Sequence, residues 1–313
     1  MQPIRIVGAL IDNISKVIVG KEEAIEYALI ALLCRGHVLI EDVPGVGKTT
    51  LASALAKSLS CSFRRIQFTP DLMPSDVTGF TLVNFQTGQM EFREGAVMSQ
   101  VVLADEINRT SPKTQSALLE VMEEHQVTVD GVTHALPQPF IVLATQNPSE
   151  FVGTYPLPEA QMDRFFLKIS IGYPTVEQEM DVLARYSTSV KPLDTLRPVC
   201  SAQDVLALQE MVTQIYCSPE VRSYVANIAA ATRKDPALTL GASTRAAIAL
   251  IHGAQACALL DGRDFIIPED VQHMARAVLC HRLVLNPEAR MKGVTAEAVI
   301  DHIMQTTAVP VKL

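Results

Sequence analysis

The chain has 313 residues, and its 48% hydrophobic and 19% charged content excludes an intrinsically disordered protein. A net charge of −8 and a pI near 5.4 argue against a dedicated nucleic-acid-binding surface. The six cysteines form no CxxC pair, charged residues interrupt the N-terminal stretch, and no apolar run approaches the roughly 20 residues of a membrane span. We therefore expect a soluble, cytoplasmic protein with reduced thiols.

The first 35 residues predict two helices around a turn at Val19-Gly20. Apolar residues recur at helical spacing on both sides of this turn. The turn lies just before a predicted strand, and two interpretations of it are open. Val19 and Gly20 contact the adenine ring of a bound nucleotide, or the segment is ordinary core packing.

A glycine-containing loop at 41–50 follows a short apolar run fit for a buried strand and precedes a helical pattern at 51–59. Strand, glycine-rich turn and helix form the context of a phosphate-binding loop, because the glycines let consecutive N–H groups point at one anion. Lys48 is expected against the β- and γ-phosphates, and Thr49 as a ligand of Mg²⁺. The predicted binding residues of this loop are Pro44, Gly45, Val46, Gly47, Lys48, Thr49 and Thr50.

One position departs from the strict phosphate-loop pattern. Asp42 stands where that pattern has a glycine, so that only Gly45-x-Gly47-Lys48-Thr49 matches. The alternative is an ordinary glycine-containing loop with a chance Lys-Thr pair. The rest of the chain has to decide between the two.

Two β-hairpins are predicted within the first half of the chain. Residues 62–68 alternate enough for a strand, and within 69–95 two strand-like runs flank Gln86-Thr87-Gly88. Residues 127–134 predict the second hairpin, with Asp130-Gly131 as its turn. Hairpins inserted into an α/β core are either candidate contact surfaces or surface decoration.

An acidic pair ends the apolar run at 100–104. At the carboxyl end of a strand, Asp105 would hold the Mg²⁺ shell and Glu106 would polarise the water that attacks the γ-phosphate. Such a pair is common by itself. After a Gly-x-Gly-Lys-Thr loop, however, the two parts support one another as halves of one nucleotide site.

Two more strands are predicted at 140–145 and 166–171, and each has a polar neighbour. Asn147 follows the first strand, where it would orient the attacking water or sense the γ-phosphate. Its alternative is a simple Asn-Pro turn. Arg164 ends a short helix immediately before the second strand, and a structural ion pair with Asp163 or Glu159 is the alternative to a catalytic role.

After residue 173 strand-like runs largely disappear. Helical patterns follow at about 177–189, 202–215, 219–233, 244–260, 269–280 and 296–306. We expect an α/β nucleotide-binding core over 1–173, with hairpin inserts at about 69–95 and 127–134, and a smaller all-helical lid over 174–313. Arg245 falls in the first turn of the longest of these helices, where a cation opposes the helix dipole, so a negative partner is expected. A salt bridge to a surface carboxylate is the alternative to a functional role of Arg245.

These parts, in this order, resemble an AAA+ ATPase and more specifically the MoxR family. The resemblance runs from about Val19 to His302 and rests on residues 39–49, 104–109, 144–148, 158–165 and 241–245. It implies a P-loop core with a five-stranded parallel sheet between helices, a helical lid, and ATP and Mg²⁺ as cofactors. The roles it implies are Lys48 and Thr49 as Walker A, Asp105 and Glu106 as Walker B, Asn147 as sensor 1, Arg164 as arginine finger and Arg245 as sensor 2.

The resemblance also implies a closed homo-oligomeric ring, commonly a hexamer, in which Arg164 reaches a neighbour's nucleotide. Members of the family act as chaperone-like remodellers or maturation factors, often with a partner that carries a von Willebrand factor A domain. Both hairpins would turn toward the pore of such a ring.

A nucleic-acid motor or loader is the alternative function, and the acidic pI counts against it. A nucleotide-gated scaffold without turnover conflicts with the intact Glu106 and Asn147. A small-molecule kinase would have no use for a helical lid and an arginine finger. The client, the ring size, the hairpin that contacts the client, and whether Arg245 acts on its own subunit's nucleotide stay open.

Overall fold

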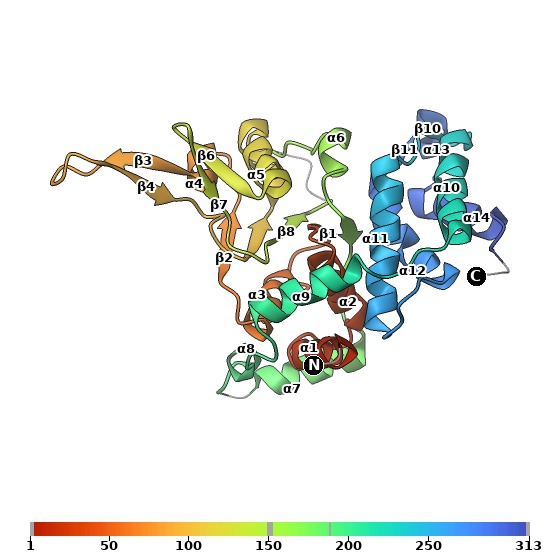
Figure 1. Ribbon diagram of the computed structural model, residues 1–313, viewed down its shortest axis with the longest axis horizontal. Helices are drawn as coiled ribbons and strands as arrows, with labels where there is room; N and C mark the ends of the chain where they lie inside the picture. Colours follow the sequence, from red (N-terminus) through yellow and green to blue (C-terminus); the bar gives the residue numbers. More distant parts are fainter. Residues whose placement is uncertain (1–2, 149–152, 188, 311–313) are drawn as a thin grey trace.

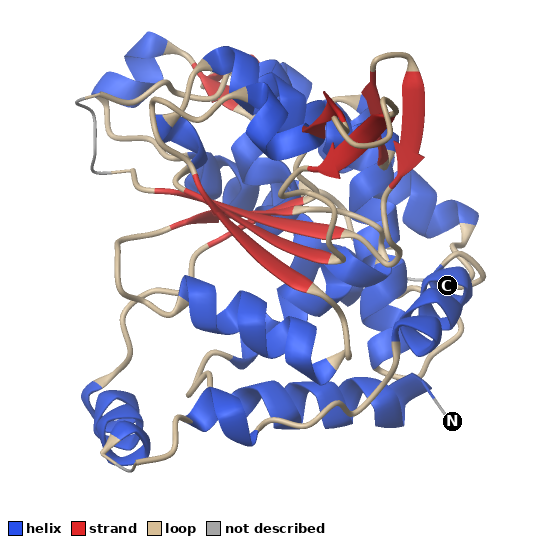
Figure 2. Ribbon diagram, turned by 90° about the vertical axis from the view of Figure 1, so that its left-hand side faces the viewer, coloured by secondary structure: helices blue, strands red, loops and turns tan. Residues whose placement is uncertain are grey.

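The computed structural model describes residues 3–148, 153–187 and 189–310. Residues 1–2 of the predicted core and residues 311–313 of the predicted lid therefore lie outside the described residues. Its centre is a five-stranded parallel sheet in the order β2-β5-β8-β1-β9 (Figure 2). The strands are β1 (Val38–Glu41), β2 (Phe63–Gln67), β5 (Val101–Asp105), β8 (Ile141–Gln146) and β9 (Leu167–Ile169). The predicted five-stranded sheet is confirmed.

The three inner strands β5, β8 and β1 are buried on both faces, as their nearly continuous apolar sequences predict. Successive residues contact opposite faces: Val38 and Ile40 pack with one set of helices, and Leu39 packs with the other. Helices α1 (Pro3–Ser15), α2 (Glu22–Leu33) and α3 (Lys48–Ser58) cover the first face. Helix α5 (Pro112–Glu124) covers the second.

The register of the sheet brings the polar strand ends together. Glu41 pairs with Gln146 at the end of β1, and Gln67 pairs with Asp105 at the end of β2. Because the strands are parallel, the loops that leave their carboxyl ends all start at one edge of the sheet. The predicted phosphate loop and the predicted acidic pair lie at this edge.

Both predicted hairpins are present. The first is formed by β3 (Gly79–Val83) and β4 (Met90–Glu94), preceded by a short helix α4 (Pro74–Thr78), and it projects far from the body of the molecule (Figure 1). The second is formed by β6 (Gln126–Val129) and β7 (Val132–Ala135). The rings of Phe92 and His134 stack with centroids 3.8 Å apart, which ties the two hairpins together at the base of the first.

The chain beyond β9 is helical, as predicted. Near the core lie α7 (Val176–Tyr186), α8 (Pro192–Thr195) and α9 (Ala202–Val212), which run along α1–α3 (Figure 1). A bundle follows, formed by α10 (Pro219–Lys234), α11 (Thr244–Leu260), α12 (Pro268–Leu279), α13 (Pro287–Met291) and α14 (Ala296–Thr306). The short helices α8 and α13 were not predicted, and neither was the pairing of β10 (Leu238–Leu240) with β11 (Val284–Leu285), because such short elements carry no readable periodicity.

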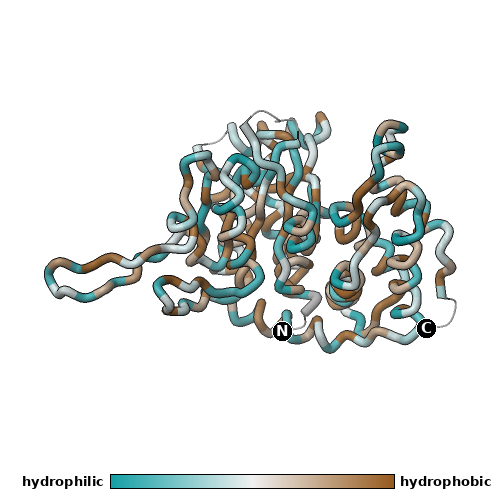
Figure 3. The backbone as a smooth tube through the Cα atoms, turned by 90° about the horizontal axis from the view of Figure 1, so that it is seen from above, coloured by the Kyte–Doolittle hydropathy of each residue, from teal (hydrophilic) through white to brown (hydrophobic). Residues whose placement is uncertain are grey.

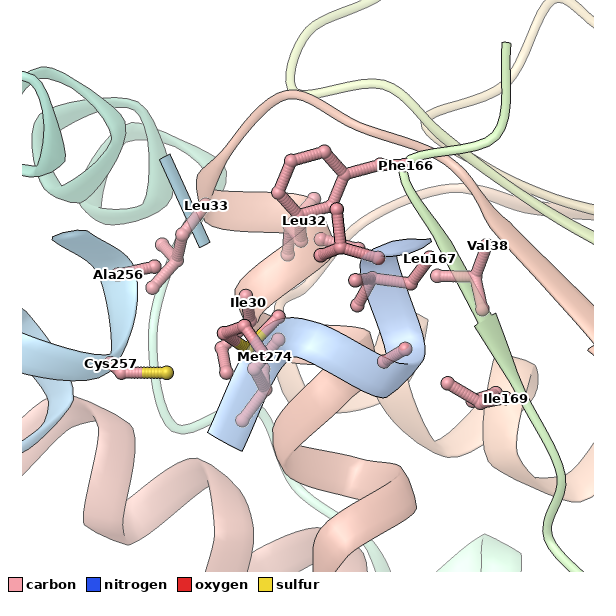
Figure 4. Packing of buried hydrophobic residues seen from close by; sticks show 14 of the residues in the cluster. Ile30, Leu32, Leu33, Val38, Phe166, Leu167, Ile169, Ala256, Cys257 and Met274 are labelled. Carbon is pink, nitrogen blue, oxygen red and sulfur yellow. The ribbon is translucent and has the colours of Figure 1, made fainter. Parts of the chain in front are cut away.

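Three short helical turns complete the fold: η1 (Ile107–Arg109), α6 (Glu159–Met162) and η2 (Cys280–Arg282). Helix α2 is the central contact between sheet and bundle, since its apolar side chains lie between β1 and β9 on one side and α11 and α12 on the other (Figure 4). Ile30, Leu32 and Leu33 are each at most 4% exposed, and burial of such side chains contributes about 1.5–3 kcal/mol each. Within the described ranges, no helix is both long enough and apolar enough to cross a membrane.

Candidate nucleotide-binding site

The phosphate loop adopts the conformation that its glycines predict. Gly45 (φ 87°) and Gly47 (φ 93°) are in the left-handed region, and α3 begins at Lys48 directly after Gly47. The first N–H groups of α3 therefore face the loop, as anion binding requires. An open cavity of about 390 Å³ lies there, and its lining residues are Pro44, Gly45, Gly47, Lys48, Thr49, Thr50, Arg65, Gln67, Asp105, Glu106 and Asn147.

Most of the predicted binding residues are thus brought together around one cavity. Val46 instead packs against the hydrophobic core. The turn at Val19-Gly20 lies beside the loop, because the neighbouring Ile18 side chain comes within 3.9 Å of a Cβ built on Gly47. The described structure does not place Val19 or Gly20 among the residues that line the cavity.

Lys48 is held across the loop, with Nζ donating a hydrogen bond to the carbonyl oxygen of Asp42 at 2.7 Å. Burial lowers the pKa of Lys48, while the carboxylates of Asp42, Asp105 and Glu106 act in the opposite direction. An ammonium group in this position adds positive charge to the helix N-terminus that faces the cavity.

Thr145 at the end of β8 fixes both members of the acidic pair. Its hydroxyl donates to Asp105 Oδ1 at 2.6 Å and accepts from the backbone N–H of Glu106 at 2.9 Å. Glu106 has φ 57°, a left-handed conformation that costs a non-glycine residue on the order of 1 kcal/mol. The hydrogen bond from Glu106 N to Thr145 is one of the contacts that hold this conformation and thereby direct the Glu106 carboxylate.

Two residues of β2 contact the acidic pair and were missed in the sequence. Arg65 donates to Asp105 Oδ2 from Nη2 at 2.6 Å and from Nε at 3.1 Å, and Gln67 donates to Glu106 Oε2 at 2.7 Å. Arg109 also lies 3.2 Å from Glu106 Oε2. Arg65 and Gln67 are two residues apart on a predicted strand, so their side chains lie on the same face. This spacing is the sequence feature that could have identified them together.

Asp42, the residue that departs from the loop pattern, binds the backbone of the segment that follows β9. Its Oδ2 accepts hydrogen bonds from Ile171 N and Gly172 N at 2.7 Å and from Ser170 Oγ at 3.0 Å, while Oδ1 accepts from Val43 N at 2.8 Å. Burial would raise the pKa of Asp42, but these hydrogen bonds outweigh it and the pKa is lowered. The carboxylate thus ties the phosphate loop to the end of β9.

The two predicted catalytic arginines lie elsewhere. Arg164 and Arg245 both contact Glu123, at 3.1 Å each, and both line a second cavity of about 230 Å³. The negative partner of Arg245 in the structure is the carboxylate of Glu123 in the core, as in the salt-bridge alternative. Arg164 pairs with this same residue and not with Asp163 or Glu159 in the part of the chain that is described. We call the surface around Arg35, Arg164, Arg245, Ile248 and His252 the arginine face.

The lid holds the segment that carries Arg164. The buried guanidinium of Arg282 donates to the carbonyl oxygen of Phe165 at 2.7 Å and lies 2.8 Å from Asp163 Oδ1. The ring Nε2 of His281 is 3.0 Å from the same carbonyl oxygen. Burial lowers the pKa of Arg282 to about 10, although Asp163 partly offsets this effect. A shift of η2 would therefore move residues 163–165.

The residues present fit Mg²⁺, which prefers oxygen ligands. The Thr49 hydroxyl and the Asp105 carboxylate line the same cavity as Lys48, and Asp105 Oδ2 already attracts a cationic group, Arg65. Asn147 is buried and lines this cavity as well. The geometry provides a place for phosphates, two oxygen ligands for a cation, and a carboxylate and an amide that can orient a water molecule.

Comparisons with known proteins agree with this geometry. Residues 37–167 match the "ATPase family associated with various cellular activities (AAA)", and residues 230–303 match the "AAA lid domain". The chain is 52% identical to "Uncharacterized protein YeaC" of Bacillus subtilis, over 98% of this chain and 96% of that protein. It is 42% identical to "Chaperone MoxR1" of Mycobacterium tuberculosis, over 96% of this chain and 81% of that protein.

A solved structure is also similar throughout. The crystal structure of a candidate ATPase from Cytophaga hutchinsonii superposes with a TM-score of 0.92 at 40% identity, and the match covers 98% of this chain and 96% of that one. Because these matches cover nearly the whole chain, they include both the sheet and the helical bundle. The chain described here belongs to the MoxR family of AAA+ ATPases.

Proposed function

We propose that this protein binds ATP and hydrolyses it with Mg²⁺ in the cavity at the start of α3. The observation that carries the proposal is the convergence of Lys48, Thr49, Asp105, Glu106 and Asn147 on one cavity. The loop amides and Lys48 would bind the phosphates, with Thr49 and Asp105 as the ligands of Mg²⁺. Bound Mg²⁺ supplies charge neutralisation on the β- and γ-phosphates.

Glu106 and Asn147 are proposed to orient the attacking water, with Glu106 accepting its proton. Gln67 and Arg109 hold the Glu106 carboxylate before that step. Glu106 must exchange at least one of these partners for the water. Gln67 is thus proposed to control how readily Glu106 becomes available.

The proposed active assembly is a closed homo-oligomeric ring, with a hexamer as the expected size. This proposal is supported by the position of Arg164 and Arg245, which line a cavity other than the one around Lys48. An arginine finger supplied by a neighbour stabilises the charge that develops on the transferred phosphoryl group. Turnover would then require contact between two copies of the chain.

The proposed role is that of a chaperone-like factor that matures or activates a protein complex, with a von Willebrand factor A domain protein as the expected partner. The relative named "Chaperone MoxR1" supports the first part by analogy. The projecting β3–β4 hairpin supports a client contact, since Phe85 is 98% exposed and apolar stretches run along the hairpin (Figure 3). The six cysteines, all in described segments, are free, which supports a cytoplasmic location.

The enzymatic proposal is tested by phosphate release from ATP. The wild-type protein should release phosphate only with Mg²⁺, Lys48→Ala should lose ATP binding, and Glu106→Gln should bind ATP but lose at least a hundredfold in turnover. Wild-type turnover in Glu106→Gln would refute the assignment. Hydrolysis without added Mg²⁺ in the presence of a chelator would refute the metal requirement.

The client proposal is tested with Glu106→Gln, which should hold ATP and retain partners. A von Willebrand-type protein or an enzyme under maturation, retained only with ATP, would support the role. Replacing Phe85 and Met90 by serine should abolish this retention but leave basal turnover unchanged, because both lie on the projecting hairpin. Retention of nucleic acid, with stimulation of turnover by single-stranded DNA, would favour a nucleic-acid motor.

A further inference from the structure

Helix α7 exposes an apolar face. Val176 is 76% exposed, Met180 66% and Leu183 65%, and each residue of α7 is at least partly exposed. At about 100° per residue these three side chains lie within about 60° of one another around the helix. Tyr173, before the helix, and Tyr186, near its end, are also exposed. We call these five residues the α7 stripe.

The opposite face of α7 is fixed to the core. Gln178 Nε2 donates to the carbonyl oxygen of Gly20 at 3.2 Å, and Arg185 Nη1 donates to the carbonyl oxygen of Ser15 at 3.1 Å. Gln178 also forms a capping box with Thr175. Because Gln178 and Arg185 point away from the stripe, α7 cannot rotate to bury Met180 without losing these contacts.

The orientation of α7 is the reverse of that expected for a surface helix. An amphipathic helix normally buries its apolar stripe in the core and exposes its polar side. Here the side chains bonded to the core are Gln178 and Arg185, whereas Val176, Met180 and Leu183 face solvent. An apolar patch that is kept on the outside in this way marks an interaction surface.

The core-facing side of α7 lies near the phosphate loop. Gln178 contacts Gly20, which lies two residues after Ile18, and Ile18 packs toward Gly47 of the phosphate loop. The chain that leads into α7 leaves β9 at Gly172, where the Asp42 carboxylate binds it. A protein that approaches the nucleotide cavity from this side therefore meets the stripe.

We propose that the α7 stripe is covered by a second copy of this chain, whose arginine face packs on it in the ring. This inference rests on the proposed function, in which Arg164 reaches a neighbour's nucleotide. The arginine face can do so only if it comes close to the nucleotide cavity, and α7 lies near the phosphate loop of that cavity. The stripe and the nucleotide cavity are then two parts of one side of the subunit interface.

The two surfaces have complementary charge and polarity. Helix α7 carries three acidic residues and one basic residue, with Glu177 and Glu179 beside the stripe. The cavity of the arginine face is lined by four arginines and two carboxylates. It also offers apolar surface, including Ile248, which is 50% exposed. An acidic and apolar helix fits this surface better than it fits a second α7 stripe.

The first test uses Met180→Glu combined with Leu183→Glu, and Met291→Glu as the control. Met291 is 89% exposed on α13, so its replacement also introduces a negative charge, one where the stripe variant introduces two, at a site outside α7. With the Mg²⁺ complex of a non-hydrolysable ATP analogue, wild type and control should form rings, measured by light scattering. The stripe variant should stay monomeric, bind the analogue normally and lose at least tenfold in turnover. Ring formation with full turnover would overturn the proposal.

Loss of folding would be recognised by circular dichroism. The milder pair Met180→Gln with Leu183→Gln then serves as the test. It is expected to show smaller losses of ring formation and of turnover. If wild type hydrolyses ATP as a monomer, the proposed ring fails together with this inference. If wild type forms rings and Arg164→Ala abolishes turnover while the stripe variant still assembles and works, only this inference fails.

The second test identifies the surface that meets the stripe. The stripe variant keeps its arginine face, and Arg164→Ala keeps its stripe, so that a mixture of these two impaired chains can form one working interface. Mixing should raise turnover well above the sum of the two separate variants, whereas mixing the stripe variant with Glu106→Gln should give no such increase. Without rescue in the first mixture, pairing of the stripe with the arginine face is wrong. A stripe variant that is active but no longer retains a protein client would assign the stripe to that client.

Discussion

The guanidinium of Arg245 lies 3.1 Å from Oε1 of Glu123, and Arg164 lies 3.1 Å from Oε2 of the same carboxylate. One residue of α5 thus binds an arginine from the lid and an arginine from the core. Both arginines line a cavity other than the one around Lys48. This arrangement presents two positive charges together on one surface, where a neighbour's phosphates could meet both.

Replacing Arg245 by alanine should leave ATP binding by the same chain intact and lower turnover at least tenfold. The reason is its position in the arginine face, away from its own nucleotide cavity. Binding is measured with a fluorescent ATP analogue and turnover by phosphate release. Arg290→Ala, an exposed arginine on α13, is the matched control and should behave as wild type. A loss of ATP affinity in the monomeric chain would contradict the prediction.

Arg65 should compete with Mg²⁺ for Asp105. In the structure it donates two hydrogen bonds to Asp105 Oδ2, an oxygen that Mg²⁺ would use. Arg65→Ala is therefore expected to lower the Mg²⁺ concentration for half-maximal turnover severalfold. The neighbouring Arg64 contacts Gly95 and Glu94 instead, so Arg64→Ala should leave this concentration unchanged. A higher Mg²⁺ requirement in Arg65→Ala would show that Arg65 assists the site.

Asp42→Asn should destabilise the fold by about 2–3 kcal/mol at pH 7, because several hydrogen bonds to a charged acceptor are lost. The hydrogen bonds keep the folded-state pKa of Asp42 below its unfolded value of about 3.9. Stabilisation by the carboxylate is then fully present above pH 3.9 and lost as the pH falls through the folded-state pKa. Urea unfolding at several pH values should show the difference between wild type and variant shrinking below about pH 4.

The control for that series is Asp12→Asn on the exposed side of α1, which should cost less than about 0.5 kcal/mol. A difference for Asp42→Asn that stays constant down to pH 3 would mean that the charge of Asp42 is not what stabilises the loop. The replacement of an acceptor oxygen by a donating NH2 group would then explain the effect of the substitution.

Arg282→Leu should cost about 3–5 kcal/mol, because it leaves the Asp163 carboxylate without its buried partner. The variant should also expose the segment around Arg164 to proteases, since Arg282 holds the Phe165 carbonyl. Arg276→Leu removes an ion pair with Asp301 at the surface and should cost at most about 1 kcal/mol. Equal effects of the two substitutions in chemical denaturation would contradict the proposed link between lid and core.

The sequence was sufficient for the sheet, both hairpins, the helical lid and most of the residues around the nucleotide cavity. These follow from local signals: continuous apolar runs for β5 and β8, positive-φ glycines in the phosphate loop, and the turn at Asp130-Gly131.

The remaining features depend on contacts between distant segments. Arg65 contacts Asp105 because β2 and β5 are neighbours in register, which no local pattern records. Asp42 binds Gly172 because β1 and β9 are adjacent. The sharing of Glu123 by two arginines requires the lid to lie against α5. The helical pattern at 177–189 predicts that α7 is a helix. It does not predict that the apolar stripe is exposed, because periodicity does not show which face is covered.

The central claim, that Arg164 acts on a neighbour's nucleotide, is tested most directly by mixing two inactive variants. Arg164→Ala keeps Glu106, and Glu106→Gln keeps Arg164, so a mixed ring contains interfaces with one working copy of each. The account predicts that neither variant alone releases phosphate and that the mixture recovers a substantial fraction of wild-type turnover. A mixture that stays inactive, although mixed rings are shown to form, would contradict it and place Arg164 in its own subunit's site.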